Sequence, residues 1–132
     1  MSALYTGGMV FDGMNKPIEG HAVLVQGQRI DKVAPVGEFD GFSGRRVETT
    51  GGTLMPGLFD CHVHLCYDAA ADPFTAMSKV DDAHLVIRAL RHAQVALRGG
   101  VTTTRDCGGK DYLEFAVRDA CNGGEFLGPT IR

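Results

Sequence analysis

The sequence predicts an α/β protein in which short β strands come first and alternating strands and helices follow. Up to about residue 55, runs of β-branched and aromatic residues alternate with glycine-containing turns. Beyond that point, strand-like and helix-like apolar patterns follow one another twice. The change of pattern predicts two domains, residues 1–55 and residues 56–132.

From Leu4 to about Val36 the sequence has the pattern of a small antiparallel β region. The runs "LYTGGMVFDG" and "HAVLVQGQRIDKVAPVG" carry strand-forming residues between glycines, and Gly27-Gln28 predicts a tight hairpin turn. The next stretch, "GEFDGFSGRRVETTGGTLMPG", is rich in glycine and polar residues. Its Pro56-Gly57 pair predicts a turn from which the next strand starts.

Residues 56–132 read as strand, helix, strand, helix. The strands are "LFDCHVHL" and "VTTTRDC", and a third strand is expected to begin in the terminal "GPTIR". The first helix runs from Asp81-Asp82 to Gly99-Gly100, with apolar residues at helical spacing: Leu85, Val86, Ala89, Leu90, Ala93 and Leu97. The second helix ends at Gly123-Gly124 and has a similar apolar set: Leu113, Ala116, Val117, Ala120 and Cys121.

Such alternation predicts parallel βα units whose right-handed connections place both helices on one side of the strands. A complete (β/α)₈ barrel has about 250 residues. The 132 residues therefore fit only the first two βα units of a barrel, preceded by a β domain. We expect the fold to be incomplete in this chain, with open strand edges.

Composition excludes several classes of function. A content of 44% hydrophobic and 22% charged residues is typical of a globular protein. The net charge of -3 and pI near 5.9 argue against nucleic acid or an acidic membrane as a partner. Since no secretion signal or membrane span is recognised, we expect a cytoplasmic protein with reduced thiols at its four cysteines: Cys61, Cys66, Cys107 and Cys121.

The segment "MPGLFDCHVHL" contains two histidines, His62 and His64, one residue apart. Alternation along a strand predicts one face with Asp60, His62 and His64 and another, packed on the helices, with Phe59, Cys61, Val63 and Leu65. Two imidazoles about 7 Å apart along a strand can converge on one divalent cation. An isolated pair of this kind is also found as ordinary exposed or core histidines, but the acidic residue, the Pro-Gly turn and the βα pattern favour a metal site.

Other polar residues are weaker candidates. Asp60 is a candidate for supporting a ligand or the neighbouring backbone. Arg105 and Asp106, at the end of the second strand, are candidates for the substrate rim, although we favour a local salt bridge and a turn there. We expect the loop residues Asp68 and Asp72, and the helical residues His84 and His92, to face solvent.

With "GGMVFDG", "VLVQGQRIDKVAPVG" and "GGVTTTRDCGG", the block "MPGLFDCHVHL" resembles the opening part of the amidohydrolase superfamily of metal-dependent hydrolases. The similarity is greatest to its imidazolonepropionase-like and Xaa-Pro dipeptidase-like branch. The resemblance implies a barrel with a β-sandwich built from both ends of the chain. It also implies that His62 and His64 are first-strand ligands of a divalent metal, usually Zn²⁺, with one or two ions in the complete enzyme.

The implied activity is hydrolysis of C–N bonds in amides, cyclic amides or dipeptide-like small molecules by metal-activated water. The family's other ligands and its catalytic aspartate belong to later strands, so the catalytic residues stay unassigned and this chain alone is expected to be inactive. Oligomer formation is left open. The alternative hypothesis is a short, non-catalytic metal-binding or interaction module derived from the same fold, with Cys66 or water as a further ligand.

Overall fold

The computed structural model describes residues 2–132 and contains two compact units, Met1–Pro56 and Gly57–Arg132. We call the first the β unit, because its regular elements are strands and one short 3₁₀ helix. The second, which alternates strands and helices, is the βα unit. Within residues 2–132, each helix is too short or too polar to cross a lipid bilayer.

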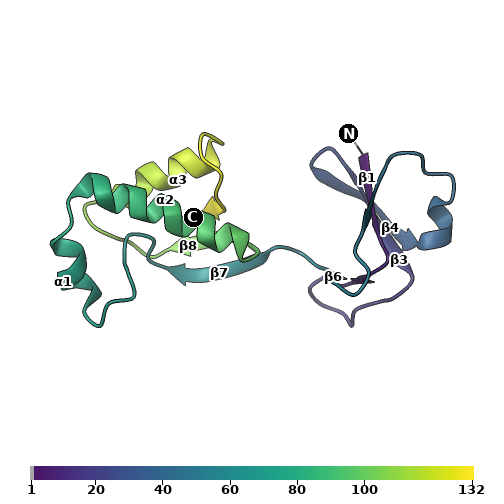
Figure 1. Cartoon of the computed structure of the whole chain (residues 1–132), viewed down its shortest axis with the longest axis horizontal. Helices are drawn as coiled ribbons and strands as arrows, with labels where there is room; N and C mark the ends of the chain where they lie inside the picture. The colour runs from purple at the N-terminus through teal and green to yellow at the C-terminus, as the bar shows by residue number, and fades with distance from the viewer. Residues whose placement is uncertain (1) are drawn as a thin grey trace. The chain divides into compact units, whose positions relative to one another are not determined.

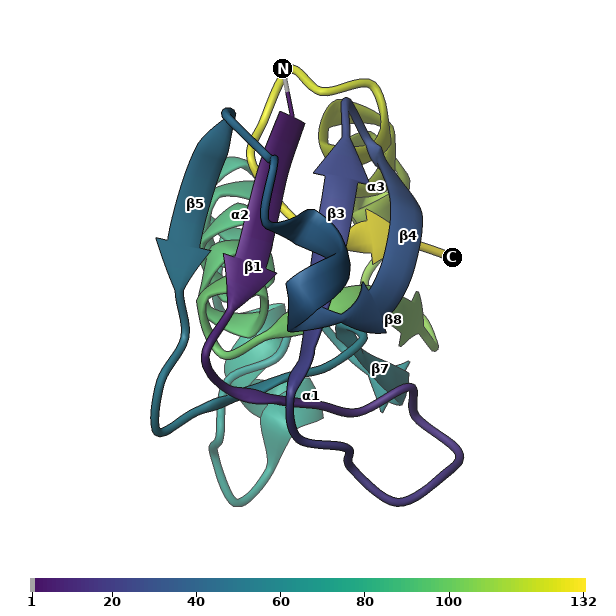
Figure 2. The same ribbon diagram turned by 90° about the vertical axis from the view of Figure 1, so that its right-hand side faces the viewer.

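The main sheet of the β unit has four strands in the order β4-β3-β1-β5 (Figure 2). Their bounds are β1 Ser2–Thr6, β3 His21–Gln26, β4 Arg29–Pro35 and β5 Arg45–Glu48. β3 runs antiparallel to both β1 and β4, and the two residues between β3 and β4 form the predicted hairpin turn with Gly27 at φ +59°. These strands confirm the antiparallel prediction.

The sequence predicted no strand in the stretch that follows. β5 pairs parallel with β1, and β6 (Thr53–Leu54) pairs parallel with β2 (Met9–Val10). Both β5 and β6 lie in the stretch that is rich in glycine and polar residues. They are short, and bonds to residues more than 40 positions earlier, such as Thr49 N–H to the Thr6 carbonyl at 2.8 Å, hold this segment in place.

The two faces of this sheet differ. One face packs against the 3₁₀ helix η1 (Val36–Phe39), and its buried cluster includes Leu4, Leu24 and Phe39. On the other face, Tyr5 and Val33 line a cavity described below. Because side chains alternate across a strand, the side chains of adjacent residues such as Leu4 and Tyr5 point to opposite faces of the sheet.

The βα unit contains a parallel sheet in the order β7-β8-β9, as predicted. The strands are β7 Leu58–Val63, β8 Val101–Asp106 and β9 Thr130–Ile131, and the helices are α1 Pro73–Ser78, α2 Asp82–Arg98 and α3 Leu113–Asn122. Figure 1 shows α2 and α3 on the same side of β7 and β8, which confirms the predicted placement of the two helices.

Local signals explain where the helices begin and end. The Asp81 carboxylate accepts the His84 amide at the start of α2, and Gly100, at φ +89°, follows its end. α1 was not predicted, because six residues are too few for a helical pattern. Its start is nevertheless encoded by Asp72, which accepts the Thr75 amide, and by Pro73 in the first turn.

One buried cluster holds the βα unit together. Its members come from the loop after β7, all three helices and β9: Leu65, Cys66, Met77, Leu85, Ala89, Ala93, Val117, Cys121 and Ile131. Val63 packs against this cluster, as predicted, but Phe59 is 71% exposed and Cys61 is also exposed. The prediction is wrong for these two residues because α2 lies against β8 and α3 against β9, which leaves β7 exposed from Leu58 to His62.

Candidate functional site

His62 and His64 meet at the carboxyl end of β7. His62 lies inside the strand and is exposed, whereas His64 follows the strand and is half-buried. Their Nε2 atoms are 3.2 Å apart, and their ring planes are inclined by 69°. The two imidazoles therefore direct the same ring nitrogen toward a common point.

A β-bulge in β7 lies just before this meeting point. Asp60 pairs with Thr104 and Val63 with Asp106, so β7 uses one more residue than β8 over this span. An extra residue interrupts the regular side-chain alternation on which the predicted shared face of Asp60 and His62 depends. The Asp60 carboxylate instead turns to accept the His62 backbone N–H at 3.1 Å.

His64 is held from two directions. Its Nδ1 lies 2.7 Å from the carbonyl oxygen of Gly108, and its ring stacks on Tyr67 with centroids 4.6 Å apart and planes inclined by 11°. A carbonyl oxygen can only accept, so Nδ1 is the donor, and in the neutral ring Nε2 keeps its lone pair. Gly108 has φ +109°, a conformation that favours glycine and sets the direction of this loop.

Asp106 connects the ends of β7 and β8. Its carboxylate accepts the Gly108 N–H at 3.0 Å and the Leu65 N–H at 3.4 Å. The predicted turn after β8 is therefore present. The predicted salt bridge is wrong, because within residues 2–132 no ion pair joins Asp106 to Arg105, whose side chain is exposed instead.

Cys66 does not complete a metal site. Its thiol is fully buried, and burial, followed by the negative charges of Glu114 and Asp106, raises its pKa. A metal ligand must be a thiolate, which these surroundings disfavour. Among residues 2–132, no group of three or more His, Cys, Asp or Glu side chains is arranged to hold a metal ion. The candidate site consists of His62 and His64 alone.

One further histidine has a role that the sequence did not reveal. His84 lies on the surface with its side chain 74% exposed, as predicted, but His92 is half-buried and its Nδ1 donates to the Leu65 carbonyl at 2.9 Å. His92 thereby fastens the loop after β7 to α2. Its position three residues after Ala89, on the apolar face of α2, was the signal that could have identified it.

The loop acids serve local structure. Asp68 and Asp72 are exposed, which confirms the prediction that they face solvent. Asp68 lies 3.3 Å from the guanidinium of Arg88, and Asp72 caps α1. The hydrogen bond from Thr75 lowers the pKa of the Asp72 carboxyl group.

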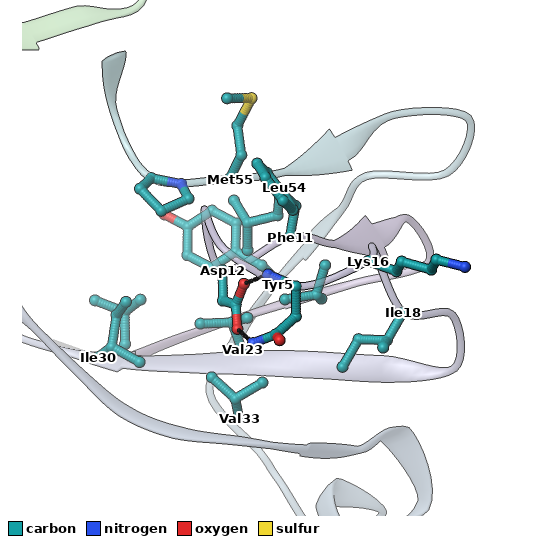
Figure 3. Close-up of a pocket in the computed structure, with 14 residues that line it drawn as sticks. Tyr5, Phe11, Asp12, Lys16, Ile18, Val23, Ile30, Val33, Leu54 and Met55 are labelled. Carbon is teal, nitrogen blue, oxygen red and sulfur yellow. Dashed lines mark hydrogen bonds between the residues drawn. The ribbon is translucent and has the colours of Figure 1, made fainter. Parts of the chain in front are cut away.

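A separate cavity lies in the β unit. It has a volume of about 790 Å³, and Figure 3 shows Tyr5, Val23, Val33 and other apolar side chains around it. Asp12 lies in this cavity, but its carboxylate already accepts backbone N–H groups of Met14 and Asn15, and these bonds lower its pKa to about 2. The wall of this cavity contains neither histidine nor cysteine.

A second cavity, of about 530 Å³, lies at the carboxyl ends of β8 and β9. Arg105, Asp106 and Gly108 belong to its wall, together with residues of α3. The carboxyl ends of β7 and β8 carry four of the five residues that the sequence singled out for a site, and the fifth, Asp60, lies in the middle of β7: His62 and His64 are on the first strand end, Arg105 and Asp106 on the second.

Comparison with known proteins gives consistent results. The model of the family described as "Amidohydrolase family" matches residues 53–131. An imidazolonepropionase of Hahella chejuensis is 27% identical over 103 residues, which cover 74% of this chain and 24% of that protein. An imidazolonepropionase of Chromobacterium violaceum is 31% identical over 104 residues. The chain thus spans about a quarter of the length of these curated relatives.

Solved structures show the same relationship over nearly the whole chain. A Xaa-Pro dipeptidase with bound methionine superposes with a TM-score of 0.84 at 27% identity, over 99% of this chain and 32% of that one. A prolidase complexed with N-methylphosphonate-L-proline gives a TM-score of 0.79 at 30% identity, over 99% of this chain and 31% of that one. Because the family model also covers more than half of the sequence, the chain belongs to the amidohydrolase family.

Proposed function

We propose that this chain supplies the N-terminal portion of a metal-dependent hydrolase that cleaves amide or related C–N bonds. In this proposal the β unit is part of a β-sandwich domain, and the βα unit is the start of a (β/α)₈ barrel. Membership of the amidohydrolase family and the parallel order β7-β8-β9 support it. Barrel enzymes carry their active sites at the carboxyl ends of the strands, where His62 and His64 lie.

The observation that carries the proposal is the approach of the two histidine rings. Two nitrogens that both bind one zinc ion at about 2.0–2.1 Å can be at most about 4.2 Å apart. The Nε2 atoms of His62 and His64 are 3.2 Å apart, which fits joint binding of one ion. A divalent cation bound there would polarise the substrate carbonyl and activate water for attack.

The residues of this chain would mainly bind and orient. His62 and His64 supply two of the four ligands of a tetrahedral zinc ion, so further ligands and the group that handles the proton come from outside this chain. Asp60 and Asp106 support the backbone next to the histidines through the bonds described above. Arg105, exposed at the same strand ends, remains a candidate for contact with the substrate.

The class of substrate follows from the names of the relatives. A prolidase, a Xaa-Pro dipeptidase and imidazolonepropionases are all named for small molecules with an amide or a cyclic amide. We therefore propose a small dipeptide-like or cyclic amide substrate. Two ligands are too few for a hydrolytic zinc site, so the 132-residue chain alone is expected to be inactive.

The test uses the full-length product of the gene that encodes this chain, purified with zinc. Hydrolysis of Xaa-Pro dipeptides, N-acyl amino acids and cyclic amides is measured for the unmodified protein and for His62→Ala and His64→Ala. We expect each substitution to lower kcat/KM by at least about 100-fold. His84→Ala, which removes an exposed histidine, is the control and should retain activity. Full activity in the double variant His62→Ala, His64→Ala would overturn the proposal.

A further inference from the structure

We infer that Gly108 and Tyr67 are positioning residues that hold His64 in the tautomer and orientation in which its Nε2 can bind a metal ion. The inference rests on the proposed function for the metal itself, but its evidence is the geometry around His64. Each of the two residues controls a different property of the ring. Gly108 sets the position of the proton, and Tyr67 sets the plane.

The Gly108 carbonyl fixes the proton. At 2.7 Å from Nδ1 it can only accept, so the neutral ring carries its proton on Nδ1 and leaves Nε2 free. The carbonyl is itself fixed, because Gly108 has φ +109° and its N–H donates to Asp106 at 3.0 Å. Gly108, in the loop after β8, thus determines the tautomer of His64, which follows β7.

Tyr67 restricts rotation of the ring. Its aromatic plane lies almost parallel to that of His64, with centroids 4.6 Å apart. Phe74 meets the Tyr67 ring at 67° with centroids 5.3 Å apart, and Tyr67 also packs against the buried cluster of the βα unit. The contact between the two side chains is between their rings, so the ring rather than the hydroxyl of Tyr67 acts on His64.

A consequence for His62 follows. With a lone pair on His64 Nε2, the 3.2 Å contact requires that His62 Nε2 carry the proton and donate it. A metal ion held by both nitrogens would need a lone pair on His62 Nε2, so the neutral His62 ring would then carry its proton on Nδ1. His64 is therefore set in advance for metal, and His62 changes tautomer when metal binds.

The experiment measures ring ¹⁵N shifts in the full-length protein labelled at histidine nitrogen, without metal and at about pH 8, where imidazoles are neutral. We expect His64 to be protonated at Nδ1 and His62 at Nε2, and zinc to move only the His62 proton. In Gly108→Ala and Tyr67→Leu, the His64 signals should shift toward a mixture of tautomers. Zinc affinity should fall by about 10–100-fold.

Two control variants separate positioning from general damage. Tyr67→Phe keeps the stacked ring and should behave like the unmodified protein. Gly124→Ala places alanine at another positive φ, +78°, with open space around it, and should leave His64 and zinc binding unchanged. Since Gly108→Ala introduces backbone strain, Tyr67→Leu provides an independent variant if the glycine variant does not fold.

The outcomes distinguish this inference from the proposed function. A His64 ring protonated at Nε2, or unchanged tautomers and affinity in both Gly108→Ala and Tyr67→Leu, would overturn the inference while leaving the metal site possible. If the variants disturb the His64 tautomer but the unmodified protein does not bind zinc, the positioning of His64 stands and the proposed function fails.

Discussion

The β unit and the βα unit both contain a sheet with one covered face, but they differ in what the remaining surface offers. In the β unit the open face is apolar and forms a cavity of about 790 Å³ whose wall contains no histidine or cysteine. In the βα unit the polar residues of the candidate site, His62, His64 and Asp106, lie at the strand ends. Parallel strands bring their carboxyl ends to one edge of the sheet, so the topology points to the candidate site there.

The largest expected effects test whether each unit has a core of its own. Leu4 in the β unit and Leu85 in the βα unit are fully buried, so Leu4→Ala and Leu85→Ala should each lower the free energy of unfolding by about 2–5 kcal/mol. Urea unfolding followed by circular dichroism measures the effect. Ile87→Ala is the control, because Ile87 lies on α2 with its side chain 63% exposed. Equal losses for Leu85→Ala and Ile87→Ala would contradict the assigned core.

A smaller effect is expected where the backbone of β7 approaches β8. A Cβ atom added to Gly57 would lie 2.1 Å from the Thr102 hydroxyl oxygen, so Gly57→Ala should destabilise the protein by about 1–3 kcal/mol. Gly37 in the β unit has open space around it, and Gly37→Ala should change stability little. Thermal unfolding compares the two, and a similar melting temperature for both variants would refute the close approach.

Asp106 should matter to both stability and metal binding. Asp106→Ala leaves the Leu65 and Gly108 N–H groups without their acceptor, which should cost about 1–3 kcal/mol and loosen the loop that contacts His64. Asp31→Ala, at an exposed position of β4, is the matched control. Urea unfolding and zinc titration of the full-length protein measure both effects. Unchanged zinc affinity in Asp106→Ala would show that the Asp106 carboxylate does not affect metal binding by the histidine pair.

The smallest effects concern pH and occur in both units. Hydrogen bonds from Asn15 and Met14 lower the Asp12 pKa from 3.8 to about 2, and the His84 N–H lowers the pKa of Asp81. Because each folded-state pKa is below the unfolded value, the stabilisation is complete above the unfolded pKa. It is lost as the pH falls through the folded pKa. Carboxyl ¹³C NMR should show an Asp12 midpoint near 2, and a midpoint near 3.8 would contradict the observed bonds.

The sequence predicted the βα unit better than the β unit, for a physical reason. Long amphipathic helices and β-branched strands are local patterns, so α2, α3, β7 and β8 were predicted from their own residues. β5 and β6 were missed because their short segments become strands only through pairing with β1 and β2, which are distant in sequence. The strand propensity of a short segment does not predict which distant strand it pairs with.

The same distinction applies to the site. The H-x-H spacing identified His62 and His64 as a converging pair. Two residues that are two positions apart on one strand are close in space whatever the rest of the fold does. The partners of His64 and the anchor of the loop were not predictable, since Gly108 and His92 reach them across 44 and 27 residues respectively. The bulge at Cys61 and His62 was likewise invisible, because it depends on the register with β8.

Zinc titration by calorimetry of the full-length protein tests the central claim most directly. If His62 and His64 form part of a metal site, the double variant His62→Ala, His64→Ala should bind zinc at least about 100-fold more weakly than the unmodified protein, since it lacks two of the four ligands. His84→Ala should bind zinc as the unmodified protein does. Equal zinc affinity in the double variant and the unmodified protein would contradict the account.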